Sequence, residues 1–213
     1  MPGLLQVVVG RFYDALYSLS AIERQRQKIV PEARGVVLEI GIGKGLNLPY
    51  YDPARVERVI GIDPDVDTMA KVRRRRARPP ISVDLVEASA EYIPLSSASI
   101  DTVVLTYSAG AIADIAGALA EMRRVLKPNG HLIFCDHGRS HDRDVARLQD
   151  RIDPWWQRMA RGSHLNRDLV VLLDEAGFRI EMLDTFYAMP RPKVLSFHYV
   201  GSAVLSGAAL TAD

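Results

Sequence analysis

The sequence contains a single cysteine, no long hydrophobic run and almost no excess of charge, and each shortage excludes a class of protein. One cysteine, Cys135, cannot form an internal disulfide, and the first residues lack the pattern of a signal peptide, so we expect a reducing, cytoplasmic environment. No apolar stretch reaches the roughly 20 residues that span a bilayer, so any membrane contact would be peripheral. Lys and Arg number 27 against 26 Asp and Glu, which gives no general electrostatic reason to bind nucleic acid.

The apolar content that is present suits one sizeable domain. The chain has 213 residues, of which 48% are hydrophobic, and two independent domains would be a tight fit. We expect a main domain over 31–203, preceded by a helical segment over 1–30 and followed by a flexible tail over 204–213. The helical segment has the apolar spacing of amphipathic helices that either pack on the core or form a lid. In the second case Phe12 and Tyr17 are candidates for contact with a substrate or an interface.

After Pro31, short apolar runs alternate with turn signals and helical stretches. This alternation predicts repeated β–α–β units and a mainly parallel sheet, whose ligands bind beyond the carboxyl ends of the strands. The expected strands cover 36–40, 59–62, 81–86, 101–105, 131–135, 178–183 and 194–201, and the expected helices cover 66–76, 112–126, 143–159 and 166–176.

A glycine-rich loop follows the first expected strand. Gly41, Gly43 and Gly45 stand at every second position, where glycine permits positive φ and lets a ligand approach the backbone. A dinucleotide-binding loop would place its third glycine where Leu46 stands. Glu39 puts a carboxylate beside the loop, and a carboxylate suits a cation better than a pyrophosphate. The loop therefore favours a cationic ligand.

A second carboxylate ends the next expected strand. Asp63 should reach the same crevice as Glu39, because neighbouring parallel strands end at one edge of the sheet. A carboxylate accepts hydrogen bonds from both hydroxyls of a ribose. Asp63 also precedes Pro64, a pair that is common in turns, so the two carboxylates together carry more weight than Asp63 alone.

An ordered set of motifs then matches a known family. From about residue 36 to residue 201, the chain resembles the class I S-adenosylmethionine-dependent methyltransferases. The matching motifs cover 37–45, 61–64, 88–94, 99–104 and 124–130. The resemblance implies a Rossmann-like, doubly wound α/β fold, with a mainly parallel seven-stranded sheet, helices on both faces and an N-terminal helical lid.

The same resemblance implies S-adenosylmethionine as the cofactor, S-adenosylhomocysteine as the product and no metal. Two positions depart from the family pattern. Lys44 stands where a small residue is usual, and Ser89 replaces the aspartate that usually meets the adenine amino group, so adenine would depend on the Ser89 hydroxyl and nearby backbone groups. The implied cofactor-binding residues are Glu39, Gly41, Gly43, Gly45, Asp63, Pro64, Ser89, Ala90, Glu91 and Thr106.

The residues for the methyl acceptor should follow the fourth and fifth strands. Methyl transfer is an in-line displacement, so the protein must hold an unprotonated nucleophile and exclude water. Asp136 and His137 are the candidate catalytic residues, with His137 as a base that Asp136 orients; alternatively His137 only bonds a loop. Cys135 is interpreted as a core residue. Further candidates for substrate contact, beside Phe12 and Tyr17, are Tyr107, Trp155 and Arg167.

Two narrower resemblances concern the acceptor. Segments 136–137, 153–156, 162–168 and 199–203 resemble the thiol S-methyltransferases called methyltransferase-like 7, whereas the glycine loop with 46–51 is similar to bacterial phosphatidylethanolamine N-methyltransferases. A thiol has a free pKa of about 8.5, so a base or positive field at His137 or Arg167 would raise its ionised fraction. An ethanolamine headgroup would need carboxylate or aromatic contacts for its cation.

Other readings remain open at this point. Another small-molecule N- or O-methyltransferase and a non-catalytic S-adenosylmethionine-binding protein are both compatible with the motifs. A nicotinamide-dependent dehydrogenase is disfavoured by Leu46 and Glu39. The arginine run over 73–76 is either a solvated helix end or a contact for anionic lipid. The partner is expected to be a small-molecule methyl acceptor, and the oligomeric state stays undetermined.

Overall fold

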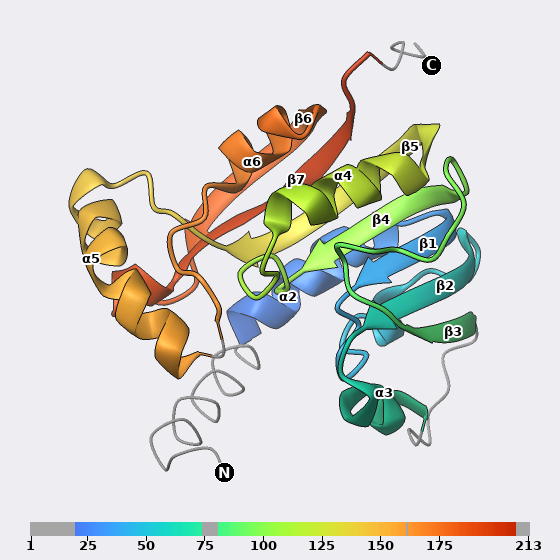
Figure 1. Ribbon diagram of the computed structural model, residues 1–213, viewed down its shortest axis with the longest axis horizontal. Helices are drawn as coiled ribbons and strands as arrows, with labels where there is room; N and C mark the ends of the chain where they lie inside the picture. Colours follow the sequence, from blue (N-terminus) through green and yellow to red (C-terminus); the bar gives the residue numbers. More distant parts are fainter. Residues whose placement is uncertain (1–19, 74–80, 161, 208–213) are drawn as a thin grey trace.

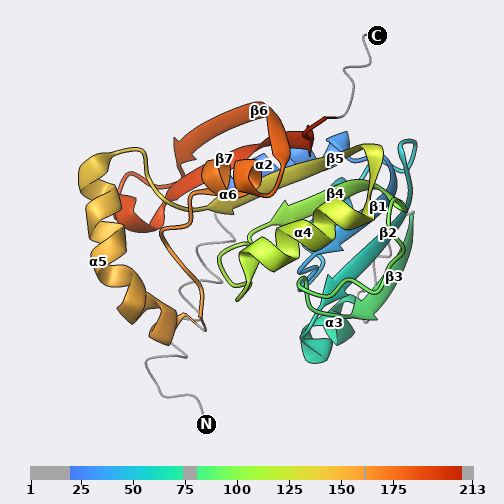
Figure 2. The same cartoon turned by 45° about the horizontal axis from the view of Figure 1, so that its top comes forward.

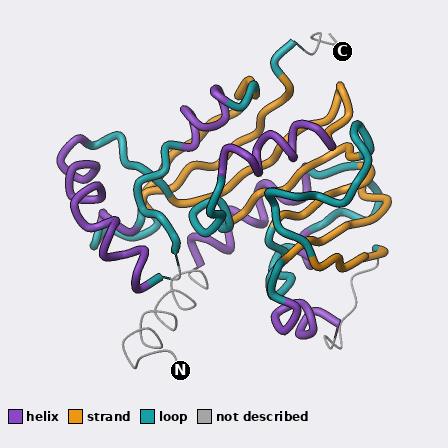
Figure 3. Tube along the Cα trace, in the orientation of Figure 1, coloured by secondary structure: helices purple, strands orange, loops and turns teal. Residues whose placement is uncertain are grey.

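The computed structural model describes residues 20–73, 81–160 and 162–207. The proposed contacts of Phe12 and Tyr17, most of the expected N-terminal helical segment and residues 74–76 of the arginine run lie outside these ranges. Figure 3 shows strands and helices alternating along much of the described trace.

The described chain forms a seven-stranded sheet in the order β3-β2-β1-β4-β5-β7-β6. The first five strands are mutually parallel, and β7 runs antiparallel to both of its neighbours. The strand order reverses beside β1, and such reversal points are where open α/β sheets bind ligands. The strands are β1 (Gly35–Ile40), β2 (Val56–Asp63), β3 (Ser82–Glu87), β4 (Ile100–Thr106), β5 (Leu126–His137), β6 (Phe178–Tyr187) and β7 (Phe197–Leu205).

Helices cover both faces of the sheet, as expected of a doubly wound fold. Both α4 and α6 lie on one face and α2 lies on the other, an arrangement that Figure 1 and the turned view in Figure 2 share. The helix α5 stands beyond the end of the sheet at which β5 stops. The helices are α2 (Ser20–Ile29), α3 (Val66–Arg73), α4 (Ile115–Val125), α5 (Arg143–Met159) and α6 (Leu169–Glu175), with 3₁₀ turns at Val30–Glu32, Leu48–Tyr50 and Lys193–Leu195.

Alternating residues of the central strands supply two hydrophobic cores, one on each face. Leu38 and Val103 belong to the core beneath α4 and α6, whereas Val37 and Val104 belong to the core that includes Ile29 of α2. Because successive side chains of a strand point to opposite faces, a strand buried on both faces reads as a continuous apolar run. This burial explains why central strands such as β1 and β4 could be located from the sequence.

The element boundaries differ from the sequence-based ranges where a polar side chain caps a helix or a turn intervenes. The helix expected over 112–126 begins at Ile115 because Asp114 accepts a hydrogen bond from Gly117 N, and the helix expected over 166–176 begins after its capping residue Asp168. The last strand starts at Phe197, after the 3₁₀ turn, and continues to Leu205, so residues 204 and 205, expected in a flexible tail, belong to this strand.

Candidate cofactor and acceptor site

Two cavities meet at the carboxyl ends of the parallel strands. The first has a volume of about 460 Å³ and the second about 410 Å³, and Gly41 and Tyr107 line both. The first cavity is further lined by Glu23, Arg26, Glu39, Ile42, Gly43, Lys44, Leu46, Tyr50, Thr68 and Thr106. The second is further lined by Ile40, Ile62, Asp63, Pro64, Ala88, Ser89, Ala90, Glu91, Ser108, Ala111, Ile112 and Ala113.

Two glycines of the loop after β1 could not carry a side chain without strain. Gly41 has φ +66°, and a Cβ placed on it would come 2.9 Å from Ser108 Cβ of the neighbouring loop. Gly45 has φ +67° and a similarly close neighbour in Leu48; it lies in the loop but outside both linings. The loop therefore presents bare backbone to both cavities, as the motif predicted.

Asp63 joins the glycine loop to the second cavity. Its Oδ2 accepts a hydrogen bond from Gly43 N at 2.9 Å, and its Oδ1 accepts one from Asp65 N at 2.8 Å. The carboxylate is only partly buried and lines the cavity, so further lone pairs remain for a ligand's hydroxyl groups. Asp63 was predicted to reach the same crevice as Glu39; it contacts the glycine loop but lines the second cavity, whereas Glu39 lines the first.

Ser89, Ala90 and Glu91 form the wall of the second cavity together with Pro64. Ser89 Oγ donates to Glu91 Oε2, and Glu91 Oε1 accepts from Asp114 N at 3.2 Å. Desolvation opposes the ionised form of Glu91, yet the hydrogen bonds from Ser89 and the backbone outweigh it and hold the pKa of this carboxyl below its usual value. The Ser89 hydroxyl is thus engaged within its own turn.

Glu39 is a buried carboxylate on the wall of the first cavity, with 2% of its surface exposed. Its Oε1 accepts from Asn47 Nδ2 at 3.0 Å, and its Oε2 accepts from the Tyr51 hydroxyl at 2.8 Å. Burial raises the pKa of Glu39 to about 7, although the hydrogen bonds from Tyr51 and Asn47 and the charge of Arg26 oppose the rise. Glu39 therefore changes charge close to neutral pH.

Arg26, from α2, brings a permanent positive charge to the same wall. Its Nη1 donates to Asn47 Oδ1 at 2.5 Å and to Thr106 Oγ1 at 3.3 Å, and its guanidinium carbon lies 4.7 Å from the centre of the Tyr107 ring. Asn47 Nδ2 also donates to Thr106 Oγ1 at 2.8 Å, so Thr106, predicted to bind cofactor, lines the cavity within this network.

Arg26, Asn47 and Tyr51 were not among the site residues predicted from the sequence. Asn47 and Tyr51 lie within the quoted run 46–51 that follows the glycine loop, and their polar groups were the available signal. Arg26 is one of several charged and polar residues of α2. Its hydrogen-bond partners Asn47 and Thr106 lie 21 and 80 positions away in the chain. Such contacts are set by tertiary packing and carry no local pattern.

Asp136 is fully buried and accepts hydrogen bonds on both carboxylate oxygens. Its Oδ2 accepts from Ser108 N at 2.8 Å and Ala109 N at 2.7 Å, and its Oδ1 accepts from His137 N at 2.8 Å.

His137 Nδ1 lies 2.9 Å from the same Oδ1 of Asp136, and His137 Nε2 lies 3.1 Å from the carbonyl oxygen of His164. The predicted adjacency is present, but both ring nitrogens face acceptors of the protein, and His137 lines neither cavity described above. This geometry favours the alternative in which His137 holds a loop.

The other acceptor-side candidates lie in different environments. Tyr107 lines both cavities with an unusual φ of +55°, and its hydroxyl accepts a hydrogen bond from Cys135 Sγ at 3.2 Å. Burial raises the pKa of the Cys135 thiol to about 12, in keeping with a core residue rather than a nucleophile.

Arg167 donates to backbone carbonyls, and Trp155 of α5 is 53% exposed and belongs to neither lining. The structure thus brings Tyr107, but not Trp155, to the cavities.

None of the helices in the described ranges combines the length and the apolar character needed to cross a bilayer. Among the same residues, His, Cys, Asp and Glu side chains form no group of three or more that could hold a metal ion.

Comparison with known proteins agrees with this geometry. Residues 38–134 match a family described as a methyltransferase domain. A thiol S-methyltransferase, TMT1B of Rattus norvegicus, is 26% identical over 184 residues, which cover 83% of this chain and 74% of the relative. A probable S-adenosylmethionine-dependent methyltransferase of Mycolicibacterium smegmatis is 34% identical over 149 residues, which cover 68% of this chain and 52% of the relative.

A solved structure shares the fold. The S-adenosylmethionine-dependent methyltransferase of Mesorhizobium loti superposes with a TM-score of 0.64 at 21% identity, over 89% of this chain and 99% of the other. With the domain match and the motifs at the strand ends, the chain is a class I S-adenosylmethionine-dependent methyltransferase, an enzyme with S-adenosylmethionine as its cofactor. Within that class, its relatives include thiol S-methyltransferases from rat and human.

Proposed function

We propose that this enzyme transfers the methyl group of S-adenosylmethionine to a small thiol. The observation that carries the proposal is the buried Arg26 guanidinium on the wall of the first cavity. The similarity to thiol S-methyltransferases over most of the chain supports the same choice.

The two cavities offer the polar groups that would bind the cofactor. Asp63 would accept the ribose hydroxyls, the turn at 88–91 and Ile112 would border the adenine, and the glycine loop with Glu39 would hold the amino-acid end. The partly buried carboxylate of Asp63, aimed into the second cavity beside bare glycine backbone, fits this nucleoside. When bound, S-adenosylmethionine supplies a methyl group on a sulfonium sulfur, which reacts with an unprotonated nucleophile.

The charge balance of the first cavity favours an anionic nucleophile. The Arg26 guanidinium brings a positive charge to the wall of this cavity, whereas burial raises the pKa of the Glu39 carboxyl to about 7 and so reduces its negative charge near neutral pH. A positive charge close to a thiol lowers the pKa of the thiol and raises the thiolate fraction. The thiol proton passes to solvent, the thiolate sulfur takes the methyl group, and the products are a methyl thioether and S-adenosylhomocysteine.

A panel of acceptors tests the proposal. Small thiols, amines, phenols and phosphatidylethanolamine vesicles would each be incubated with enzyme and cofactor, and S-adenosylhomocysteine would be quantified by mass spectrometry. We expect turnover with thiols. Inert thiols together with an amine, a phenol or the lipid that turns over would contradict the proposal.

The role of Arg26 has its own test. In Arg26→Gln we expect the pH at which kcat/KM for the thiol is half-maximal to rise by about one unit, so that the rate at pH 7 falls about tenfold and recovers at high pH. Arg24→Gln removes an exposed arginine of the same helix and serves as the control. A uniform loss of rate at all pH values would show that Arg26 acts on structure and not on thiol ionisation.

A further inference from the structure

The loop between β4 and α4 forms part of the wall of the second cavity through Ala111, Ile112 and Ala113. A carboxylate and a guanidinium hydrogen-bond to the backbone of this loop from two sides. The carboxylate is that of Asp136, which accepts hydrogen bonds from the N–H groups of Ser108 and Ala109. On the other side, the loop meets a segment that comes from the distal half of the chain, residues 163–167.

The guanidinium of Arg167 hydrogen-bonds to the carbonyl groups of the same loop. Its Nη1 donates to the Ala109 carbonyl, and its Nη2 donates to the Ile112 carbonyl at 2.6 Å and to the Ala113 carbonyl at 3.5 Å. His164 N donates to the Gly110 carbonyl at 2.9 Å. A guanidinium has five donors in a fixed fork, so one side chain can fix several carbonyls at once.

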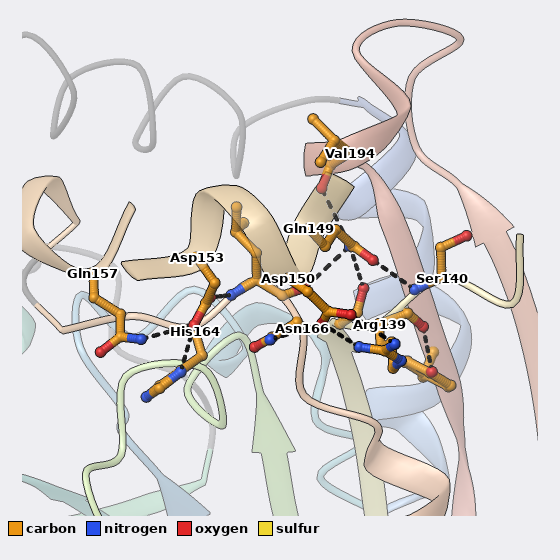
Figure 4. A network of polar contacts seen from close by, with 12 residues as sticks. Arg139, Ser140, Gln149, Asp150, Asp153, Gln157, His164, Asn166 and Val194 are labelled. Carbon is orange, nitrogen blue, oxygen red and sulfur yellow. Dashed lines mark hydrogen bonds and ion pairs between the residues drawn. The ribbon is translucent and has the colours of Figure 1, made fainter. Parts of the chain in front are cut away.

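The segment that carries Arg167 is itself held by α5, as Figure 4 shows. Asp153 accepts from Leu165 N at 2.6 Å and lies 3.0 Å from His164 Nδ1, while the buried Gln149 donates to the Leu165 carbonyl at 3.1 Å. Asn166 Nδ2 donates to Asp150 Oδ1 at 3.1 Å. The backbone around Arg167 is therefore attached to a helix that stands beyond the end of the sheet.

Close packing leaves the loop little room to move away from this segment. A Cβ placed on Gly110 would lie 2.9 Å from His137 Cε1 and 2.9 Å from Ser163 Oγ. A Cβ on Gly138 would lie 2.3 Å from the carbonyl oxygen of Arg167. The loop, the end of β5 and the 163–167 segment are thus in direct contact, so a shift in one requires a shift in the others.

We propose that Arg167 is a positioning residue for methyl transfer: it fixes residues 109–113 as the wall of the nucleoside cavity and links that wall to α5. This assignment rests on the cofactor and not on the identity of the acceptor. It also reinterprets Arg167, which the sequence suggested as a substrate contact.

The test measures binding of two ligands to the folded full-length protein by calorimetry. S-adenosylhomocysteine fills both parts of the site, whereas 5′-deoxy-5′-methylthioadenosine contains the nucleoside and lacks the amino-acid end. In Arg167→Lys, which keeps the charge but loses the fork, we expect both affinities to fall by the same factor of about ten, because the change lies at the nucleoside wall. The thermal midpoint without ligand is recorded in parallel.

Arg139→Lys is the matched control. Arg139 pairs with Asp150 in the same network but makes no contact with residues 109–113 in the described structure. We expect Arg139→Lys to leave both affinities unchanged even if its thermal midpoint falls. Unchanged affinities in a folded Arg167→Lys variant would overturn the proposal, as would an equal loss in Arg139→Lys. Neither result depends on whether a thiol is the acceptor, so failure here is distinguishable from failure of the proposed function.

Discussion

Glu39 shows at the scale of one residue how burial turns a motif carboxylate into a group that titrates near neutrality. Its side chain lies beneath the first cavity, where two hydrogen bonds and Arg26 only partly offset the loss of water. The sequence identified the residue and its charge. It did not reveal the raised pKa, because that depends on Tyr51, Asn47 and Arg26 being folded around it.

The raised pKa of Glu39 predicts a pH-dependent stability of the ligand-free protein. The pKa is about 7 in the folded state against an ordinary 4.5, so the folded protein binds more protons between these values than the unfolded chain does. The stabilising contribution is complete below about pH 4.5 and is lost as the pH rises through 7, by on the order of 3 kcal/mol.

Urea denaturation of wild type and Glu39→Gln between pH 5 and pH 8 would check this dependence. The difference in unfolding free energy between the two proteins should shift in favour of Glu39→Gln as the pH rises, because the amide carries no charge to bury. A difference that stays constant across this range would show that Glu39 keeps its ordinary pKa.

Asp136 illustrates a second residue-scale point, that a candidate catalytic carboxylate can be fully used in structure. Asp136→Asn replaces one acceptor oxygen by a donor that must face the N–H groups of Ser108 and Ala109 or those of His137. We expect a loss of about 2–4 kcal/mol in unfolding free energy, measured by urea denaturation, because buried donors lose their partner.

The control for this substitution is Asp184→Asn. Asp184 is an exposed strand carboxylate paired with Lys28, and its loss should change the unfolding free energy by less than about 1 kcal/mol. Equal effects of the two substitutions would contradict the structural role given to Asp136.

At the scale of the element, helix starts are decided by capping side chains. Asp114 accepts a hydrogen bond from Gly117 N at 2.9 Å at the start of α4. Asp168 caps the start of α6 in the same way, by accepting from Val170 N and Val171 N. The hydrophobic periodicity located both helices but placed their starts too early. Apolar residues such as Ile112 continue the pattern into the preceding loop, where they line the cavity instead.

The start of α4 offers a prediction with an internal control. Alanine is usually better than glycine in a helix by about 1 kcal/mol, but a Cβ on Gly117 would lie 2.5 Å from Asp114 Oδ2 and displace the cap. We therefore expect Gly117→Ala to leave the thermal midpoint nearly unchanged in the wild-type background and to raise it in an Asp114→Ala background. The same gain in both backgrounds would exclude the conflict between side chain and cap.

At the scale of the whole molecule, the sequence was enough for the class of fold and for the edge of the sheet that binds ligands. Strands such as β1 and β4 are buried on both faces and read as apolar runs, and the glycine loop and Asp63 mark their neighbouring ends. The contacts of Arg26 with Thr106 and of Arg167 with Ala109 could not be predicted, because each joins segments more than 50 positions apart and leaves no periodic pattern in the sequence.

The two cavities at this edge must form one site for S-adenosylmethionine if the enzyme works as described. Calorimetric titration of the folded protein with S-adenosylhomocysteine tests this directly, together with Asp63→Ala and with Asp67→Ala as a control on the exposed face of α3. We predict one molecule bound per chain, an affinity at least about tenfold weaker in Asp63→Ala, where hydrogen bonds to a charged group are lost, and no change in Asp67→Ala. Absence of binding to the folded wild-type protein, or binding that is indifferent to Asp63, would contradict the account.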